Sequence, residues 1–211
     1  TSTIGANVTT SGTQTYTGAV TLSANDTFTT TANGSVSFGG AIDGNATGKT
    51  LTISTNGTGD TTFTGAVGAT NALGNITITT DVLTAAAIKL AGTLSITNGG
   101  ASSITGIISD GASAAALTHA GTATLTLSGV NTYTGATTIN SGATLAISGS
   151  GQLGSGTYSA AINNSGTFNY SSSANQIFAA NVSRAGALSG AGTYTFNGSG
   201  TVTLTGDETL S

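Results

Sequence analysis

A short apolar–small–apolar triplet recurs along the chain and restricts its possible folds more than any other feature. An extended triplet places both apolar side chains on one face, which is the minimal pattern of a β-strand. The copies are Val20–Leu22, Val36–Phe38, Leu51–Ile53, Ile76–Ile78, Leu94–Ile96, Leu125–Leu127, Leu145–Ile147, Phe168–Tyr170, Tyr194–Phe196 and Val202–Leu204. Gly, Asn, Asp and Ser lie between them and favour turns. No sustained apolar face at helical spacing occurs, so the chain is predicted to be all-β.

A longer repeat sets the spacing of these strands. An aromatic-x-Gly-Ala motif followed by Val, Ile or Thr occurs at Tyr16–Val20, Phe38–Ile42, Phe63–Val67 and Tyr133–Thr137. The copies start 22, 25 and 70 positions apart, and the last interval is close to three steps of about 23. Weaker copies are Ile104–Ile108, Tyr158–Ile162 and Phe178–Val182. Very short strands at this period indicate a parallel β-helix, or β-solenoid, of about nine coils in an open-ended array.

Two other structural classes are alternatives to this interpretation. Disorder would need a strong net charge, whereas the net charge is −4 and the mean hydropathy is +0.21. A string of antiparallel β-sandwich domains would show longer alternating strands and hairpins every 8–12 residues or so. The 33 Gly residues suit frequent corners, and the absence of Pro suits continuous strand pairing. The solenoid therefore remains the favoured fold.

The composition also argues against several functions. Lys49, Lys89 and Arg184 are the only basic residues, too few to neutralise a nucleic-acid backbone. No apolar run is long enough for a transmembrane helix, and no basic amphipathic helix is present for lying on a membrane. The chain has no Cys, which excludes disulfides and thiolate metal sites. Its first residues lack the features of a signal peptide, so we expect a mature or internal segment.

The acidic residues do not predict an active site. They are Asp26, Asp43, Asp60, Asp81, Asp110, Asp207 and Glu208. Asp26, Asp43 and Asp60 follow one another at intervals of 17, which could stack them in adjacent coils. Most acids lie among Asn and Gly, so we expect solvated turn residues, with weak calcium contacts and glycan cleavage as lesser alternatives. The Asp207–Glu208 pair is expected to be a turn.

Two further features look catalytic or cofactor-binding and are not expected to be. His119 is the only histidine, and it has no companion ligands for a metal and no nucleophile–acid pair for a triad. Gly149, Gly151 and Gly154 match the dinucleotide-binding fingerprint, which functions only between a strand and a helix. The residues after Gly154 predict a turn and another strand. The sequence therefore predicts no catalytic, cofactor-binding or metal-binding residue and no cofactor.

Threonine pairs that flank an aromatic residue give the one candidate binding surface. They are Thr15/Thr17, Thr27/Thr29, Thr62/Thr64, Thr132/Thr134 and Thr193/Thr195. If each aromatic side chain points inward, both hydroxyls point outward. A Thr-rich outer face could bind carbohydrate or ice, and Thr is also the ordinary polar residue of an outer strand face.

One segment resembles a known family. Leu125–Ile147 carries a leucine strand, then Gly-Val-Asn-Thr-Tyr-Thr-Gly, then Thr-Ile-Asn-Ser-Gly-Ala-Thr-Leu, and it resembles the β-strand repeat of bacterial autotransporter passenger domains. Gln152–Gly156 is similar to the linker between such repeats, and Thr201–Glu208 to the start of another copy. Residues 7–80 are similar to the repeats of filamentous-haemagglutinin-type exported proteins. The resemblance implies a right-handed parallel β-helix outside a Gram-negative-type cell, used in adhesion, aggregation or matrix building, without catalytic residues.

The sequence thus predicts one β-solenoid segment over residues 1–211, haemagglutinin-like over 1–124 and autotransporter-repeat-like over 125–211. We expect a non-enzymatic structural or adhesive segment of an extracellular or cell-surface fibre. Its expected partners are further copies of itself, through head-to-tail or lateral stacking, and surface glycans. Binding of nucleic acid and insertion into a membrane are not expected.

Overall fold

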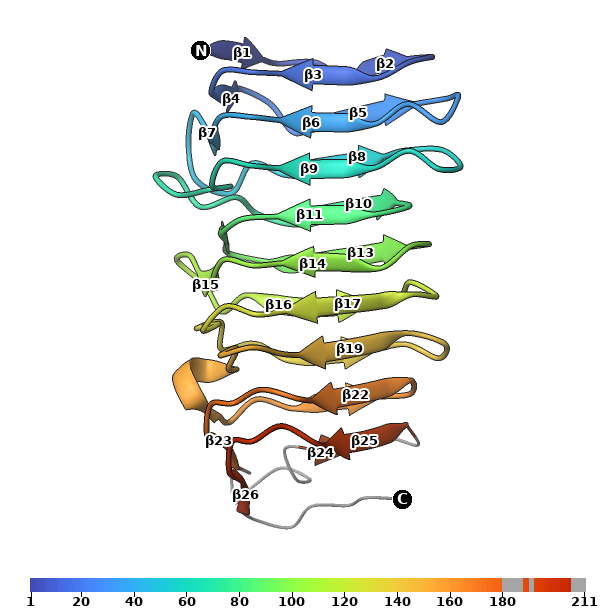
Figure 1. Ribbon diagram of the computed structural model, residues 1–211. Coiled ribbons are helices and arrows are strands. Elements are labelled where there is room, and N and C mark those ends of the chain that lie inside the picture. The colour runs from blue at the N-terminus through green and yellow to red at the C-terminus, as the bar shows by residue number, and fades with distance from the viewer. Residues whose placement is uncertain (180–187, 190–191, 206–211) are drawn as a thin grey trace.

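The computed structural model describes residues 1–179, 188–189 and 192–205 of the chain. All pairings between named strands in this part are parallel, and each strand pairs with strands about one repeat away in sequence. The chain therefore winds into a β-solenoid of about nine coils, as the sequence predicts (Figure 1). No helix in the described ranges has the length and apolar character needed to cross a membrane.

Each coil contributes a strand to two long sheets. The first sheet contains β2 (Val8–Thr10), β5 (Asp26–Thr30), β8 (Leu51–Ser54), β10 (Ile76–Thr80), β13 (Thr93–Asn98), β16 (Ala116–His119), β18 (Thr137–Ile139), β21 (Ile162–Asn164) and β24 (Leu188–Ser189). The second sheet contains β3 (Gln14–Tyr16), β6 (Val36–Phe38), β9 (Thr61–Phe63), β11 (Leu83–Ala85), β14 (Ser102–Ile104), β17 (Thr124–Leu127), β19 (Thr144–Ile147), β22 (Thr167–Tyr170) and β25 (Thr193–Phe196).

The remaining strands form a third face that is less regular. It is divided among three small sheets made of β1 (Ser2–Ile4), β4 (Val20–Leu22) and β7 (Ile42–Gly44); of β12 (Ile88–Leu90) and β15 (Ile108–Asp110); and of β20 (Thr157–Tyr158), β23 (Gln176–Ala179) and β26 (Val202–Thr205). Single bridges at Val67 connect the first of these sheets to the second. A short 3-10 turn, η1 (Gly154–Gly156), precedes β20.

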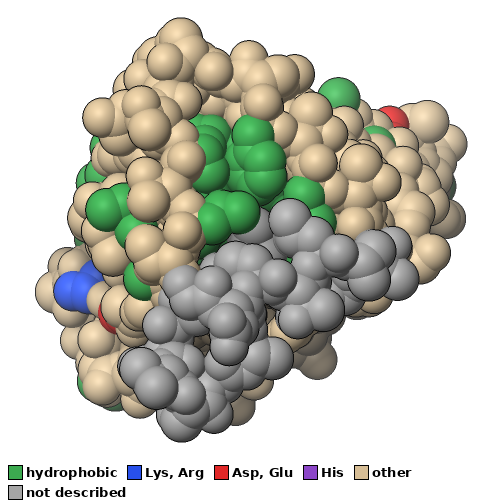
Figure 2. Space-filling view, turned by 90° about the horizontal axis from the view of Figure 1, so that it is seen from below, with side chains coloured by type: hydrophobic (Ala, Val, Ile, Leu, Met, Phe, Trp, Pro, Cys, Tyr) green, Lys and Arg blue, Asp and Glu red, His purple; other side chains and the backbone are tan. Residues whose placement is uncertain are grey.

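The predicted triplets all lie in strands, and their apolar residues form the interior, except that Phe196 and Leu204 in the last two strands are exposed. On the first sheet, Ile78 lies between Ile53 and Ile96 in register, and all three side chains are buried. On the second sheet, the rings of Phe38 and Phe63 stack with centroids 5.6 Å apart. Figure 2, which looks along the solenoid axis, shows hydrophobic side chains gathered between the outer walls. Because the inward rows continue from coil to coil, each coil covers the apolar surface of the next.

The C-terminal copies of the long repeat lie on a different face of the solenoid from the N-terminal copies. Tyr16, Phe38 and Phe63 end neighbouring strands of the second sheet, as one repeat requires. Tyr133 lies instead on the third face, one face later, where its ring packs edge-on against Tyr158 at 5.7 Å. Treating Tyr133 as three steps beyond Phe63 is therefore wrong, because residues on different faces of a coil share the same local pattern. The Phe178 copy aligns with Tyr158 through β20 and β23, while its last residue, Val182, lies outside the described residues.

Candidate functional site

The outer face of the first sheet carries two aligned rows of hydroxyl side chains. Strand pairing brings Thr27, Thr52, Thr77, Ser95, Thr118 and Thr138 into row one. It brings Thr9, Thr29, Ser54, Thr79 and Thr97 into row two. Neighbouring residues within a row are about 4.8 Å apart, and the two rows are about 7 Å apart, because they lie two residues apart on each strand.

The predicted outward direction of the threonines is confirmed for Thr27 and Thr29, since Phe28 between them is buried in the interior. The other threonine pairs do not join these rows. Thr15, Thr62 and Thr193 lie on strands of the second sheet, and Thr132/Thr134 lie on the third face. Three members of row one, Thr52, Thr77 and Ser95, are the middle residues of aliphatic triplets, and Ser54, Thr79 and Thr97 of row two lie two residues further along the same strands. Sequence reasoning could have found them by aligning the triplets one coil apart.

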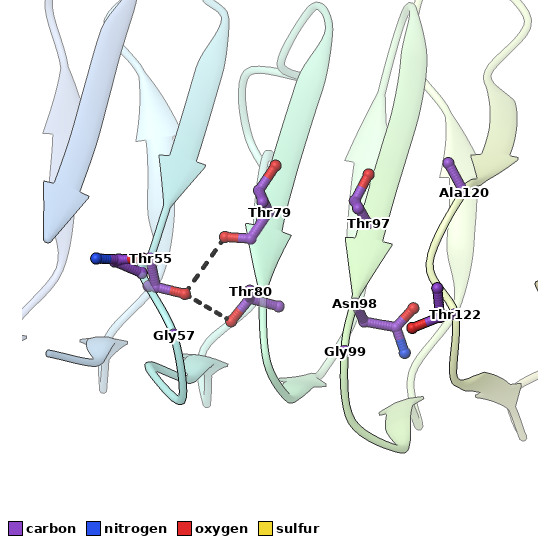
Figure 3. Close-up of a pocket in the computed structure, with 10 residues that line it drawn as sticks. Thr55, Gly57, Thr79, Thr80, Thr97, Asn98, Gly99, Ala120 and Thr122 are labelled. Atoms are coloured by element: carbon purple, nitrogen blue, oxygen red, sulfur yellow. Dashed lines mark hydrogen bonds between the residues drawn. The ribbon is translucent and has the colours of Figure 1, made fainter. Parts of the chain in front are cut away.

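A shallow groove of about 360 Å³ opens at the end of row two, where the chain turns from the first sheet towards the second. The lining residues come from four successive coils and are Thr55, Asn56, Gly57, Thr79, Thr80, Thr97, Asn98, Gly99, Ala120 and Thr122 (Figure 3). None of them is charged or aromatic. The groove is therefore a polar, neutral cavity whose lining offers hydroxyl, amide and peptide groups.

Unequal turns shape this groove. The β8–β9 connection spans residues 55–60, whereas residues 81–82 connect β10 to β11 and residues 99–101 connect β13 to β14. Figure 1 shows the β8–β9 turn projecting beyond the β10–β11 turn beside it. The long turn therefore forms a wall, and the short turns form the floor. Gly57 in this wall has φ +59°, which favours glycine over residues with a side chain.

A buried hydroxyl network supports the floor. The Thr55 hydroxyl lies 2.6 Å from the Gly59 carbonyl oxygen, 3.3 Å from the Thr79 carbonyl oxygen and 3.2 Å from Oγ1 of Thr80 (Figure 3). Oγ1 of Thr80 in turn lies 3.1 Å from Oγ1 of Thr61, which lies in β9 of the second sheet. These contacts satisfy polar groups at the corner and hold the turns in place.

His119 lies behind the groove, in an inward position of β16. Its Nε2 lies 2.6 Å from Oδ1 of Asn98, one coil away. The amide of Asn98 donates to Gly100 and Ser102, so its oxygen accepts and the histidine carries its proton on Nε2. Nδ1 is buried and has no partner among the described residues. Burial lowers the pKa of His119 to about 4, so the side chain is neutral at physiological pH. The structure thus places it in the interior, with one of its two nitrogens satisfied.

The acidic residues do not come together. Asp26 begins β5, Asp43 lies on β7 and Asp60 precedes β9, so the interval of 17 places them on three different faces. The proposed stacking is wrong because 17 residues are shorter than a coil. Asp207 and Glu208, expected to form a turn, lie outside the described residues. Among the described residues, no group of three or more His, Asp or Glu could hold a metal ion.

Two of the acids use their carboxylates to hold the third face. Oδ1 of Asp43 accepts from the backbone N–H groups of Thr70 and Asn71, at 2.9 and 3.1 Å. Oδ1 of Asp110 accepts from the N–H groups of Ala115 and Thr134, at 2.7 and 3.1 Å. Both residues lie in strands, Asp43 in β7 and Asp110 in β15, and their carboxylates bind the backbone, so neither is the solvated turn residue that the sequence predicts.

Asp26 departs from the expectation of a solvated turn residue. Its side chain is buried, and neither carboxylate oxygen has a partner among the described residues. Its register partner on the next coil is Leu51, so it occupies an inward position. Burial raises the pKa of Asp26, while the positive charge of Lys49 opposes that shift.

The glycine fingerprint at Gly149–Gly154 leads into η1 and then β20. A dinucleotide site needs the N-terminus of a longer helix after its last glycine. Here a three-residue 3-10 turn and a strand follow the glycines, so the local structure does not provide that helix.

Two further depressions lie on the third face. One, of about 330 Å³, is mainly apolar and includes Ala66, Ala87 and Ile107 in its lining. The other, of about 210 Å³, lies beside Tyr133 and Tyr158. The hydroxyls of both tyrosines contact Oγ1 of Thr137, at 2.7 and 2.8 Å. Burial raises the pKa of Tyr133 to about 12, so this hydroxyl chain is uncharged.

The Asn-Thr-Tyr motif at 131–133 has a clear structural role. Oδ1 of Asn131 accepts from the N–H of Ile108, and its amide donates to the carbonyl oxygens of Gly129 and Gln152. Both Asn131 and Tyr133 are buried. The asparagine thus connects three successive coils at a place where the third face has no named strand.

The family comparison assigns this part of the chain. Residues 117–147, from β16 through β19, match the family model of the passenger-associated-transport-repeat. This segment is similar to the passenger-associated transport repeat. The resemblance of residues 125–147 to the autotransporter repeat is therefore confirmed, and the transport repeat covers less than half of the chain. Comparisons with curated proteins and with solved structures found no match. The haemagglutinin-type resemblance of residues 7–80 stays a prediction.

Proposed function

We propose that this chain is a non-enzymatic rod segment of a protein secreted to, or displayed on, the outside of a bacterial cell, where it acts in adhesion, aggregation or matrix building. The observation that carries the proposal is a transport repeat within a β-solenoid. Passenger repeats belong to exported proteins, and the fold fits an autotransporter passenger domain. Its partners would be further copies of the chain and surface glycans.

The physical properties of the solenoid suit a rod. Nine stacked strands separated by about 4.8 Å span roughly 40 Å along the axis. Each coil is hydrogen-bonded to the coils on either side, so bending the rod would break several ladders at once. The scattered carboxylates, three of which (Asp43, Asp60 and Asp110) accept from backbone N–H groups, support a role without catalysis.

Surface display tests this proposal. Non-adherent bacteria displaying the chain should aggregate, or adhere to abiotic and matrix-coated surfaces, more than cells that display no chain. The control is Ile78→Asp, which places a charge in the buried row between Ile53 and Ile96 and should abolish the fold and the effect. Equal behaviour of wild-type and chain-free cells would contradict the proposal. Turnover of a polysaccharide by the purified chain would contradict the absence of catalysis.

A carbohydrate- or ice-binding module is the alternative, and the two hydroxyl rows of the first sheet favour it. Hydroxyls can donate and accept, so they can bond to sugar hydroxyls or to ordered water. Inhibition of ice recrystallisation would support ice binding, and retention by a glycan would support carbohydrate binding. Either effect should be abolished by Thr→Lys changes on this face if the face is responsible.

A further inference from the structure

We propose that the groove lined by Thr79, Thr97, Ala120 and Thr122 binds a neutral polysaccharide. This site deepens the carbohydrate-binding alternative and rests on it. The groove has about 360 Å³, a volume that accommodates a small ligand or a few sugar units. It is the place where row two of the first sheet meets a concave surface instead of a flat one.

Unused hydrogen-bonding capacity is the first argument. The hydroxyls of Thr79 and Thr97 lie on register-paired residues of β10 and β13, and both side chains are exposed. Neither hydroxyl bonds to another described residue, and the same is true of the exposed Thr122 hydroxyl. By contrast, the hydroxyls of Thr55 and Thr80 are occupied by the buried network. The groove therefore has a fixed floor and free hydroxyls above it.

The electrostatic character of the groove selects the ligand class. No lining residue is charged, so an anionic polysaccharide would lose hydration without gaining a cation. Lys49 and Lys89, the basic residues of the described chain, are not part of the lining. A neutral, hydroxyl-rich ligand replaces its water contacts with contacts of the same kind.

The shape of the groove distinguishes carbohydrate from ice. An ice plane needs a flat surface, whereas the projecting turn at Asn56 and Gly57 forms a wall on one side. On the next coil, row two continues not with a threonine but with Ala120, whose backbone N–H pairs with Ile96. Because the side chain of Ala120 is smaller than that of threonine, space is left between Thr97 and Thr122. The groove runs along the solenoid axis, so an extended chain could follow row two beyond it.

Affinity gel electrophoresis of the whole chain tests the site. The probes are dextran, laminarin, xylan and galactomannan as neutral polymers, and alginate as an anionic one. At least one neutral polymer should retard the chain, and alginate should not. Retardation by none of the neutral polymers, or by alginate equally well, would overturn the proposal.

A pair of matched variants locates the site. Thr79→Val with Thr97→Val removes two hydroxyls and keeps the branched shape, so binding should weaken roughly 10- to 30-fold. Thr77→Val with Thr118→Val removes two hydroxyls from row one of the same sheet and should change binding less than about twofold. Thermal unfolding followed by circular dichroism checks that each variant is folded.

The pattern of losses separates this inference from the proposals above. Equal loss in both double variants would place binding on the open face, overturning the groove while keeping a carbohydrate-binding face. Ala120→Gln, which fills the groove without adding charge, should abolish binding, and unchanged binding would overturn the site. Adhesion of displayed cells that survives Thr79→Val with Thr97→Val would leave the rod function intact, because that function does not need the groove.

Discussion

The first and second sheets run through nine strands each, whereas the third face is divided among three smaller sheets and single bridges. In the long sheets, most backbone N–H groups pair with carbonyl oxygens of the preceding or following coil. On the third face, side-chain oxygens of Asp43, Asp110, Asn131 and Gln176 accept several of these N–H groups instead. A solenoid therefore tolerates an irregular face when amide and carboxylate side chains replace the missing ladder.

This difference also explains where variation can occur. The long sheets need an apolar residue at each inward position, and that requirement produces the triplets. The third face needs a side chain of the right length at a few places, so its turns can differ in size from coil to coil. We therefore expect the long sheets to depend on packing and the third face on individual hydrogen bonds.

The largest expected effect tests packing in the long sheets. Ile78→Ala should lower the free energy of unfolding by about 3–4 kcal/mol, because a cavity would open between Ile53 and Ile96. Equilibrium unfolding in guanidinium chloride, followed by circular dichroism, measures it. The control is Thr77→Ala on the same strand, whose outward side chain should contribute less than about 1 kcal/mol. Similar losses for both variants would show that inward packing is not decisive.

The triplets and the long period predict the solenoid because both follow from backbone geometry. A strand pattern of period two sets the inward side, and a repeat of about 23 residues sets the coil. Sequence spacing does not show on which of the three faces of a coil a residue lies. For this reason the alignment of Tyr133 with Phe63 is wrong, and so is the stacking of Asp60 on Asp26 and Asp43. The contact of His119 with Asn98 depends on a register between coils that their 21-residue separation only suggests. The groove depends on turn shape, which local composition does not determine.

The second prediction concerns His119, a buried polar residue between Ile96 and Ile139 in an inward row of the first sheet. Its pKa is lowered from 6.5 to about 4 in the folded chain. Between these values the unfolded chain binds a proton that the folded chain does not, so stability falls as the pH falls from 6.5 to 4. The loss should be roughly 2–3 kcal/mol, after allowance for partial solvent screening.

His119→Gln checks this prediction. Glutamine does not titrate, and its amide can still donate to Asn98. Unfolding free energies measured between pH 4 and 7 should fall less steeply for this variant than for the wild type. Parallel pH profiles would show that other groups cause the acid sensitivity.

Asn131 provides the matching test on the third face. Asn131→Ala would leave the N–H of Ile108 and the carbonyl oxygens of Gly129 and Gln152 without their side-chain partner. We expect a loss of about 2 kcal/mol in unfolding free energy, together with faster hydrogen exchange at Ile108. The exposed Asn140 gives the control, and Asn140→Ala should cost less than about 0.5 kcal/mol. A loss no greater than that of Asn140→Ala would remove the distinction between the third face and the long sheets.

Asp26 offers the smallest effect, and its sign is opposite. It is an inward residue of the first sheet beside Leu51, so Asp26→Leu would restore the apolar row and remove a buried carboxylate without a partner among the described residues. We expect a gain of about 1 kcal/mol in the free energy of unfolding near neutral pH.

The gain from Asp26→Leu should also depend on pH. Because burial raises the pKa of Asp26, the wild type loses stability as the pH rises through that pKa, and the advantage of Asp26→Leu should grow over the same range. Thermal unfolding at pH 3 and pH 7 measures the change, and Asp81→Leu is a control on a turn residue. If Asp26→Leu destabilised the chain at both pH values, the carboxylate would be contributing a contact of its own, and a polar inward residue would be part of how the long sheets are held together.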